Sequence, residues 1–189
     1  MRFDYLNDGN ICYNSQIFQA DKLRKHRDKY MAEEAQRLNN MLESVKKHVT
    51  AEQIYRTRQG SLPIFLRRRA VELREASSGY YSHGVYFKGF GEGGTPTGDI
   101  YKLICDNYSS LECFYYHFRH AAEISYGSGF LWLLRKKDKL KLWFAPAGTL
   151  PGGGYDQLMA LDLWEHAWID SFESKSDYAM AYIRSFDWR

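Results

Sequence analysis

The first part of the chain has the spacing of apolar residues that is typical of helices. From about Gln16 to Val49 there are few turn-forming residues, and apolar side chains recur every three to four positions. The apolar positions in this run are Leu23, Tyr30, Leu38, Met41, Leu42 and Val45. A break at Thr57–Pro63, which ends in proline, separates this run from a second helical run over about Ile64 to Tyr86. The pattern therefore predicts an antiparallel helical hairpin.

After the second run the pattern changes to short, mixed elements. The segment Gly89–Gly98 is rich in glycine, follows a helix and lacks the G-K-[ST] ending of a phosphate loop, so it predicts a linker. The residues from Ser109 to Glu112 resemble the capped start of a helix that runs to about Ser125. Phe130–Leu134 and Leu140–Ala145 have strand-forming composition on either side of a charged turn, which predicts a β-hairpin.

The C-terminal segments complete the predicted architecture. A third strand is predicted at Leu158–Leu163 and a closing helix at Tyr178–Phe186. The fold class is therefore α+β, with an N-terminal antiparallel helical hairpin followed by a small α/β lobe that contains a three-stranded antiparallel sheet. The expected domains are residues 1–90 and 91–189.

Composition limits the class of protein. The 189 residues are 44% hydrophobic and 26% charged, which is typical of a globular protein, and no apolar run is long enough to span a membrane. The N-terminus has neither a secretory core nor an amphipathic presequence, so we expect a protein that stays where it is made or has lost a leader. Cys12, Cys105 and Cys113 form no C-x-x-C pair, which favours free thiols in a reducing compartment. A net charge of +3 permits an acidic partner without requiring one.

The candidate chemistry lies near the C-terminus. Asp162 and His166 are four residues apart, with the acid Glu165 and the aromatic Trp164 between them. A carboxylate and an imidazole suit iron, manganese or zinc better than magnesium or calcium. Such a pair alone is a weak pattern, because it also occurs on solvated helix faces.

Five segments resemble the iron/manganese superoxide dismutase family. The segments are Leu161–Ala167 (D-x-W-E-H-A in the family), Tyr126–Leu133 (G-S-G-W-x-W-L), Ser82–Gly89 (N-H-x-x-F-W-K-G), the linker Gly93–Gly98 and the C-terminal helix Asp177–Trp188. The resemblance extends from about Leu23 to the C-terminus. It includes departures, since Phe87 and Phe130 stand where the family has tryptophans. With these departures, the chain resembles a divergent member of the family, such as the superoxide-dismutase-like proteins of mitochondrial ribosomal small subunits.

The resemblance implies that His83, Asp162 and His166 are three of four ligands to iron or manganese. The fourth ligand comes from the first helix, and two registers compete for it. The register without a gap makes His26 the ligand. A shift of one helical turn would instead put Lys22 there, and its ammonium could replace the charge of a metal ion, leaving a metal-free fold.

Groups that surround the metal in the family are missing from this chain. The family holds metal-bound solvent with a glutamine, whose two alternative places correspond here to Gly79 and to the loop 145–148, neither of which has a side-chain amide. In the preferred register, the family's gateway histidine and tyrosine become Tyr30 and Glu34. A carboxylate at that place would repel an incoming anion.

These features lead to three functional hypotheses. The preferred one is a non-catalytic structural subunit of a larger assembly, such as the small subunit of the mitochondrial ribosome, with iron or manganese bound or absent. The alternatives are an active iron- or manganese-dependent superoxide dismutase and a stand-alone metal-binding or dimeric interaction protein. The mitochondrial matrix is the expected location.

The expected partners follow from the same resemblance. Glu165 contacts the partner subunit in the family, which implies a homodimer or a heterodimer with a similar chain. Arg67, Arg68 and Arg69 are candidate RNA contacts, although charge runs are also common on solvated helix faces. Ribosomal proteins and ribosomal RNA are the expected further partners, and a membrane is not.

Overall fold

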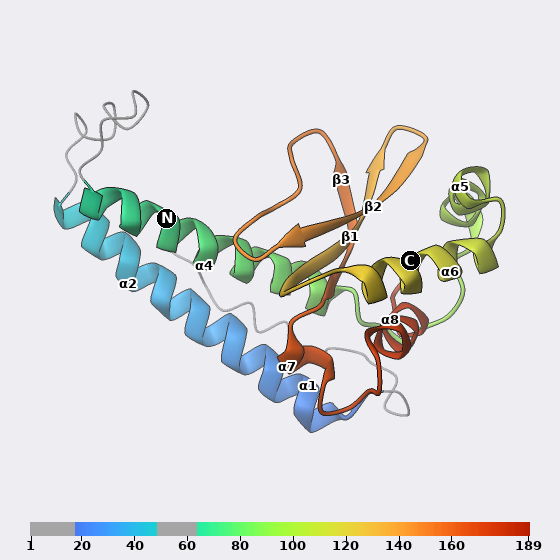
Figure 1. Cartoon of the computed structure of the whole chain (residues 1–189), viewed down its shortest axis with the longest axis horizontal. Coiled ribbons are helices and arrows are strands. Elements are labelled where there is room, and N and C mark those ends of the chain that lie inside the picture. Colours follow the sequence, from blue (N-terminus) through green and yellow to red (C-terminus); the bar gives the residue numbers. More distant parts are fainter. Residues whose placement is uncertain (1–17, 49–63) are drawn as a thin grey trace.

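The computed structural model describes residues 18–48 and 64–189, which form helices around one small sheet. Figure 1 shows an arm of long helices on one side and the sheet with shorter helices on the other. The elements in chain order are α1 (Ala20–Arg27), η1 (Asp28–Ala32), α2 (Glu33–His48), α4 (Ile64–Lys88), α5 (Gly98–Tyr108), α6 (Leu111–Ile124), β1 (Gly129–Lys136), β2 (Lys139–Pro146), β3 (Asp156–Asp162), α7 (Glu165–Trp168) and α8 (Lys175–Arg184). The predicted α+β class is confirmed.

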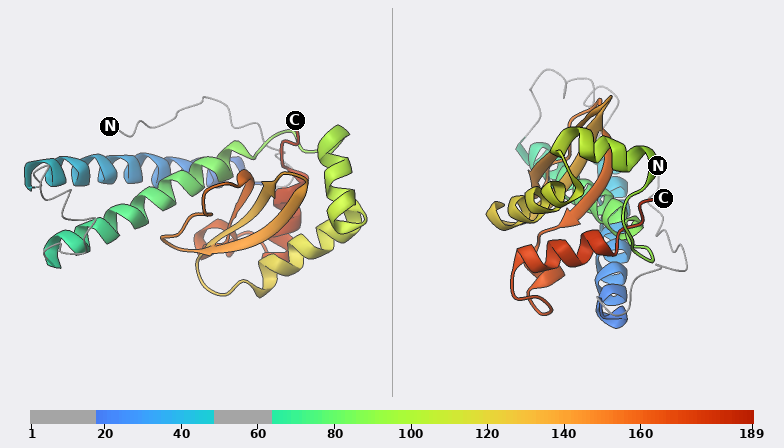
Figure 2. Two further views of the ribbon diagram at one scale, coloured as in Figure 1. Left: turned by 90° about the horizontal axis from the view of Figure 1, so that it is seen from above. Right: turned by 90° about the vertical axis from the view of Figure 1, so that its right-hand side faces the viewer.

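The arm pairs α2 with α4 (Figures 1 and 2). Leu38 and Met41 of α2 are buried against Ala76 of α4, as expected for apolar residues at helical spacing. Between α1 and α2, the backbone widens into a π-helical turn over residues 28–32. Such turns change the direction of nearby side chains and are frequent at functional sites. The predicted break at Thr57–Pro63 lies outside the described residues.

The sheet has the strand order β2-β1-β3, and both strand pairs are antiparallel. The central strand β1 is buried from Gly129 to Leu134, which explains why its sequence is a continuous apolar run without alternation. Helix α4 lies against one face of the sheet, where Tyr81 stacks on Trp132 with ring centroids 6.4 Å apart. Helices α5 and α6 contact β2. The sheet thus joins the arm to the C-terminal helices.

Buried tyrosines attach the last helix to α4. The hydroxyl of Tyr178 donates a hydrogen bond to the hydroxyl of Tyr86 at 3.0 Å, and Tyr182 donates to the backbone oxygen of Tyr86 at 3.0 Å. All three side chains are fully or almost fully buried in the main core. Because Tyr86 lies less than one turn from His83, these contacts also fix the end of α4 that carries His83.

The predicted hairpin, third strand and closing helix are present at nearly the predicted bounds. Helix α5 was not predicted from the sequence, because its first residue, Gly98, belongs to the glycine-rich segment predicted as a linker. Gly98 has φ +60°, and the N-cap Thr97 makes no capping hydrogen bond. By contrast, Ser110 caps α6 by accepting a hydrogen bond from the Cys113 N–H. The division into two domains at residue 90 stays a prediction. None of the helices over residues 18–48 and 64–189 is long and apolar enough to cross a membrane.

Candidate metal centre

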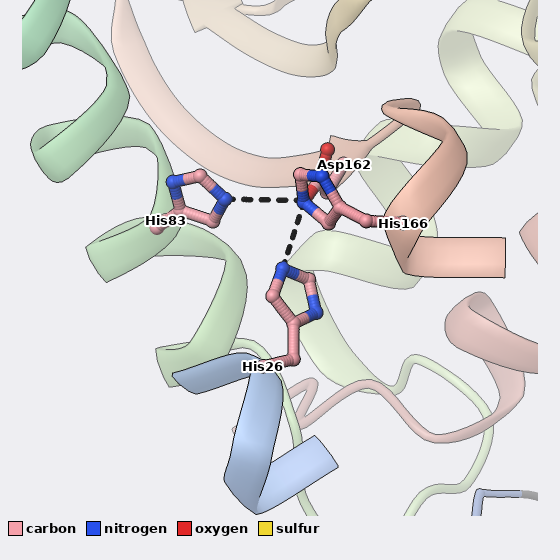
Figure 3. Close-up of side chains that lie close together, drawn as sticks. All are labelled: His26, His83, Asp162 and His166. Atoms are coloured by element: carbon pink, nitrogen blue, oxygen red, sulfur yellow. Dashed lines mark hydrogen bonds and ion pairs between the residues drawn. The ribbon is translucent and has the colours of Figure 1, made fainter. Parts of the chain in front are cut away.

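Four side chains from four different elements converge on one point, as Figure 3 shows. His26 comes from α1, His83 from α4, Asp162 from the end of β3 and His166 from α7. The Nε2 atom of each histidine lies 3.2 Å from Asp162 Oδ2, and the four candidate ligand atoms lie within 4.8 Å of one another. The structure therefore brings together all four side chains of the register without a gap.

Local backbone geometry directs these side chains inward. Asp162 is fully buried, pairs with Phe130 at the end of β3 and accepts a hydrogen bond on Oδ1 from the Trp164 N–H at 2.9 Å. This bond turns the chain into α7, so that His166 returns to the same carboxylate. On α4, the Nδ1–H of His83 donates to the Gly79 carbonyl at 2.9 Å, which leaves its Nε2 free to face Asp162.

Burial and charge act in opposite directions on this cluster. Burial alone would raise the pKa of Asp162, but the three imidazoles hold it well below its usual value. Burial lowers the pKa of His26 despite the neighbouring carboxylate. For His83, burial also acts to lower the pKa, but the carboxylates of Asp162 and Glu34 raise it. Asp162 is therefore an anion at neutral pH, as a metal ligand must be.

The donor set fits a transition-metal ion. Within the described residues, the buried Nε2 atoms of His26 and His83 make no hydrogen bond of acceptable geometry, although both lie close to Asp162. Two atoms that each lie about 2.1 Å from one ion are roughly 3 to 3.5 Å apart when the angle between their bonds is about 90 to 110°. The 3.2 Å separations match this condition. Three imidazoles and one carboxylate suit iron or manganese.

Aromatic rings surround the four side chains. The ring of Tyr30 stacks on His166 at 4.2 Å and on His83 at 5.0 Å. Phe130 meets His83 edge-on at 5.1 Å, and Trp164 stacks on His166 at 5.8 Å. A cavity of about 420 Å³ opens onto His83 and His166 and is lined by these rings, by Glu34 and by the loop 146–149. A small molecule can thus reach the cluster from one side.

Glu34 is the most unusual group in this cavity. Its Oε2 atom lies 3.7 Å from His83 Nδ1, and it has no hydrogen-bond partner among the described residues. Burial raises the pKa of Glu34 to about 7, against the opposing charges of His83 and Arg37. A Cβ atom on Gly79 would lie 3.0 Å from Glu34 Oε1, so the carboxyl group occupies the space into which a side chain at position 79 would extend.

The other candidate residues lie outside the cluster or cannot be placed. The Lys22 ammonium donates to the Asp170 carbonyl at 3.0 Å and to the Ser171 hydroxyl at 3.2 Å, so it does not enter the ligand position. Glu165 is exposed in the isolated chain, so its side chain is accessible to a second subunit. Arg68 is exposed beside Glu72, whereas the side chains of Arg67 and Arg69 lie outside the described part.

Two residues of the site were missed in the sequence. The backbone N–H of Trp164 donates a hydrogen bond to Asp162, and the Trp164 ring stacks on His166. The position of Trp164 within the D-x-W-E-H pattern could have indicated that it belongs to the site. Arg37 lines the cavity one helical turn after Glu34. Its three-residue spacing from Glu34 in the predicted first helix could have indicated that the two side chains share one face. Among the described residues that line the cavity there is no asparagine or glutamine, in agreement with the missing amide.

Comparisons with known proteins agree with this geometry. Residues 96–189 match the family model of the C-terminal domain of iron/manganese superoxide dismutases. The chain is 30% identical to a Mn/Fe superoxide dismutase of Rickettsia bellii over 185 residues, covering 93% of the chain and 85% of that protein. It is 31% identical to the Mn superoxide dismutase of Escherichia coli over 61% of the chain and 60% of that protein. A chloroplastic Fe superoxide dismutase of Arabidopsis thaliana is 34% identical over 51% of the chain and 44% of that protein. The chain belongs to the iron/manganese superoxide dismutase family.

Proposed function

We propose that this protein binds one iron or manganese ion through His26, His83, Asp162 and His166. The observation that carries this proposal is the convergence of three imidazole nitrogens on one buried carboxylate oxygen, each at 3.2 Å. Without an ion, two of these nitrogens remain buried and unpaired, which costs free energy. An ion at the centre would satisfy all of them at once.

We further propose that the protein removes superoxide slowly. Iron or manganese, when bound, supplies one-electron redox chemistry. The surrounding groups must then admit an anion and hold solvent in place. Here the cavity presents the Glu34 carboxyl group, which becomes increasingly ionised as the pH rises above about 7 and then repels anions. The cavity lining described above also offers no amide to orient solvent.

The proposed biological role is that of a structural subunit in a larger assembly, such as the small subunit of the mitochondrial ribosome, in the mitochondrial matrix. The resemblance to such subunits suggests this role, and a few large apolar side chains are exposed and accessible to a protein partner. Tyr126 is 96% exposed, and Ile124 and Ile169 are 67% and 55% exposed. Glu165 and the exposed side of His166 are the proposed place of a second superoxide-dismutase-like chain.

A second candidate function is that of an active superoxide dismutase. The complete ligand set favours it, and so does Arg37, whose charge beside Glu34 partly offsets the repulsion of anions. The two candidates agree on the metal and differ in turnover.

Metal analysis combined with a rate measurement tests both candidates. The purified protein, expressed with iron or manganese in the medium, is expected to hold about one ion per chain by elemental analysis. Superoxide removal measured by pulse radiolysis is expected to be at least 100-fold below the diffusional ceiling of enzymes. A rate near that ceiling would establish the dismutase and overturn the structural role. A protein without iron or manganese would overturn the metal centre itself.

A further inference from the structure

The excess positive charge of the chain is concentrated at the tip of the β1–β2 hairpin. Residues 135–141 contain five cations and one acid, a formal net charge of +4, whereas the whole chain carries +3. All other residues together are therefore slightly negative. Figure 1 shows this tip beside α5, well away from α1 and α7, which carry His26 and His166 of the metal centre. The position separates the hairpin tip from the metal centre.

Three of the five cations share one face of the hairpin. The strand register pairs Lys136 directly with Lys139, and Lys141 follows two residues later. Paired residues and residues two apart in a strand point to the same face. The ammonium of Lys136 also lies over the ring of Tyr155 at 5.4 Å from its centroid. We call Lys136, Lys139 and Lys141, with Tyr155 beside them, the lysine face.

The lysine face is not neutralised by acids. All three lysines are exposed, and none forms an ion pair within residues 18–48 and 64–189. The two other cations of the segment have acidic neighbours. Arg135 pairs with Asp156 at 2.9 Å. Lys137 lies in a groove lined by three acids, Asp99, Asp106 and Asp138.

The hairpin holds these like charges together in a fixed arrangement. Equal charges placed directly opposite each other destabilise a strand pair. The turn nevertheless stays closed, because Asn107 of α5 donates to the Asp138 carbonyl at 3.0 Å and accepts from the Leu140 N–H at 3.1 Å. When like charges are held together although this lowers the stability of the fold, the arrangement often belongs to a binding site.

We propose that the lysine face binds the phosphate backbone of a nucleic acid, and of RNA in the proposed assembly. Lysine binds phosphate as a point charge, and side chains two apart in a strand are about 7 Å apart, so that one backbone can contact several of them. A membrane surface fits less well, because none of the large exposed apolar residues lies on this hairpin and binding at a lipid interface uses such residues.

The choice of RNA rests on the proposed assembly role, but the surface can be tested separately. The triple variant Lys136→Gln, Lys139→Gln, Lys141→Gln is compared with a control, Lys88→Gln, Lys102→Gln, Arg119→Gln, which loses the same charge at exposed positions outside the hairpin. Binding to a fluorescent RNA stem-loop is followed by anisotropy between 50 and 200 mM salt, roughly the range over which such contacts are sensitive. Vesicles with phosphatidylglycerol serve as the competing anionic surface.

The lysine-face variant is expected to bind the RNA at least tenfold more weakly than the parent. Its plot of log affinity against log salt should be shallower by about 2, since each lost phosphate contact contributes roughly 0.7 to 0.9 to the slope. The control should change neither quantity as much. Equal losses in both variants, unchanged binding, or binding to vesicles without binding to RNA would each overturn the proposal. Metal content should be the same in all three proteins, so a failed metal centre is recognised independently.

Discussion

The ligand set and the cavity wall above it differ in how closely they follow the family. The ligand set, His26, His83, Asp162 and His166, converges as the resemblance implies. The cavity wall, formed by Tyr30, Glu34, Gly79 and the loop 146–149, has the carboxyl group of Glu34 where the resemblance implies the gateway tyrosine. The comparison teaches that holding a metal and using it depend on different residues. A chain can keep the first property while it changes the second.

The two regions also differ in what fixes them. Two of the ligand side chains are oriented by backbone groups, Asp162 by the Trp164 N–H and His83 by the Gly79 carbonyl. Glu34 instead reaches across from α2 to α4 on a flexible side chain with one unpaired oxygen. Substitutions in the ligand set should therefore abolish binding, whereas substitutions in the wall should tune it.

The largest expected effect comes from Asp162→Ala. Removing the central carboxylate takes away the only anionic ligand and leaves three imidazoles without their shared partner. We expect metal content, measured by elemental analysis, to fall below about a tenth of the parent value. The exposed Asp177→Ala is the matched control and should keep the metal. Full metal content in Asp162→Ala would contradict the proposed ligand set.

The next effect should appear in anion binding to the metal-loaded protein. Glu34→Gln removes a charge from the cavity but keeps the shape of the side chain. We expect azide to bind about tenfold more tightly above pH 8, measured by optical titration, because one repulsive charge has been removed. Metal content should stay the same.

Glu75→Gln is the control for this experiment, because Glu75 lines the same cavity but is exposed. Its effect on azide affinity should be less than about twofold, since exposed charges are strongly screened. If Glu34→Gln changed azide affinity no more than Glu75→Gln does, Glu34 would have no special part in the cavity.

Features that follow local sequence patterns could be predicted, whereas features that depend on contacts distant in sequence could not. The hairpin, the third strand and the ligand set follow local rules, such as apolar spacing and the D-x-W-E-H pattern, and could be predicted. The register of the first helix could not be decided by pattern alone, because His26 and Lys22 are one turn apart. The structure separates them through a contact distant in sequence, between Lys22 and residues 170–171. The Glu34 contact with Gly79 likewise depends on how two helices pack.

A smaller effect is expected from Lys22→Met, which tests the register directly. This variant loses the two hydrogen bonds to Asp170 and Ser171. Because both are exposed, the free energy of unfolding should fall by less than about 1 kcal/mol in a urea titration. Metal content should not change, whereas His26→Ala should lose the metal. The opposite result, with metal retained in His26→Ala and altered in Lys22→Met, would favour the shifted register.

The smallest effect should come from the contact between Glu34 and Gly79. Gly79→Ala favours the helix by up to about 1 kcal/mol, because alanine loses less backbone entropy. In the parent protein the new methyl group would press on Glu34 Oε1 at 3.0 Å, so part of this gain is lost. In a Glu34→Ala background that neighbour is absent, and the full gain should appear. Urea unfolding of the four proteins in this double-mutant cycle should give a coupling of about 0.5 kcal/mol between the two positions. A coupling of zero would mean that the carboxyl group moves aside freely, and that Gly79 does not determine where Glu34 lies.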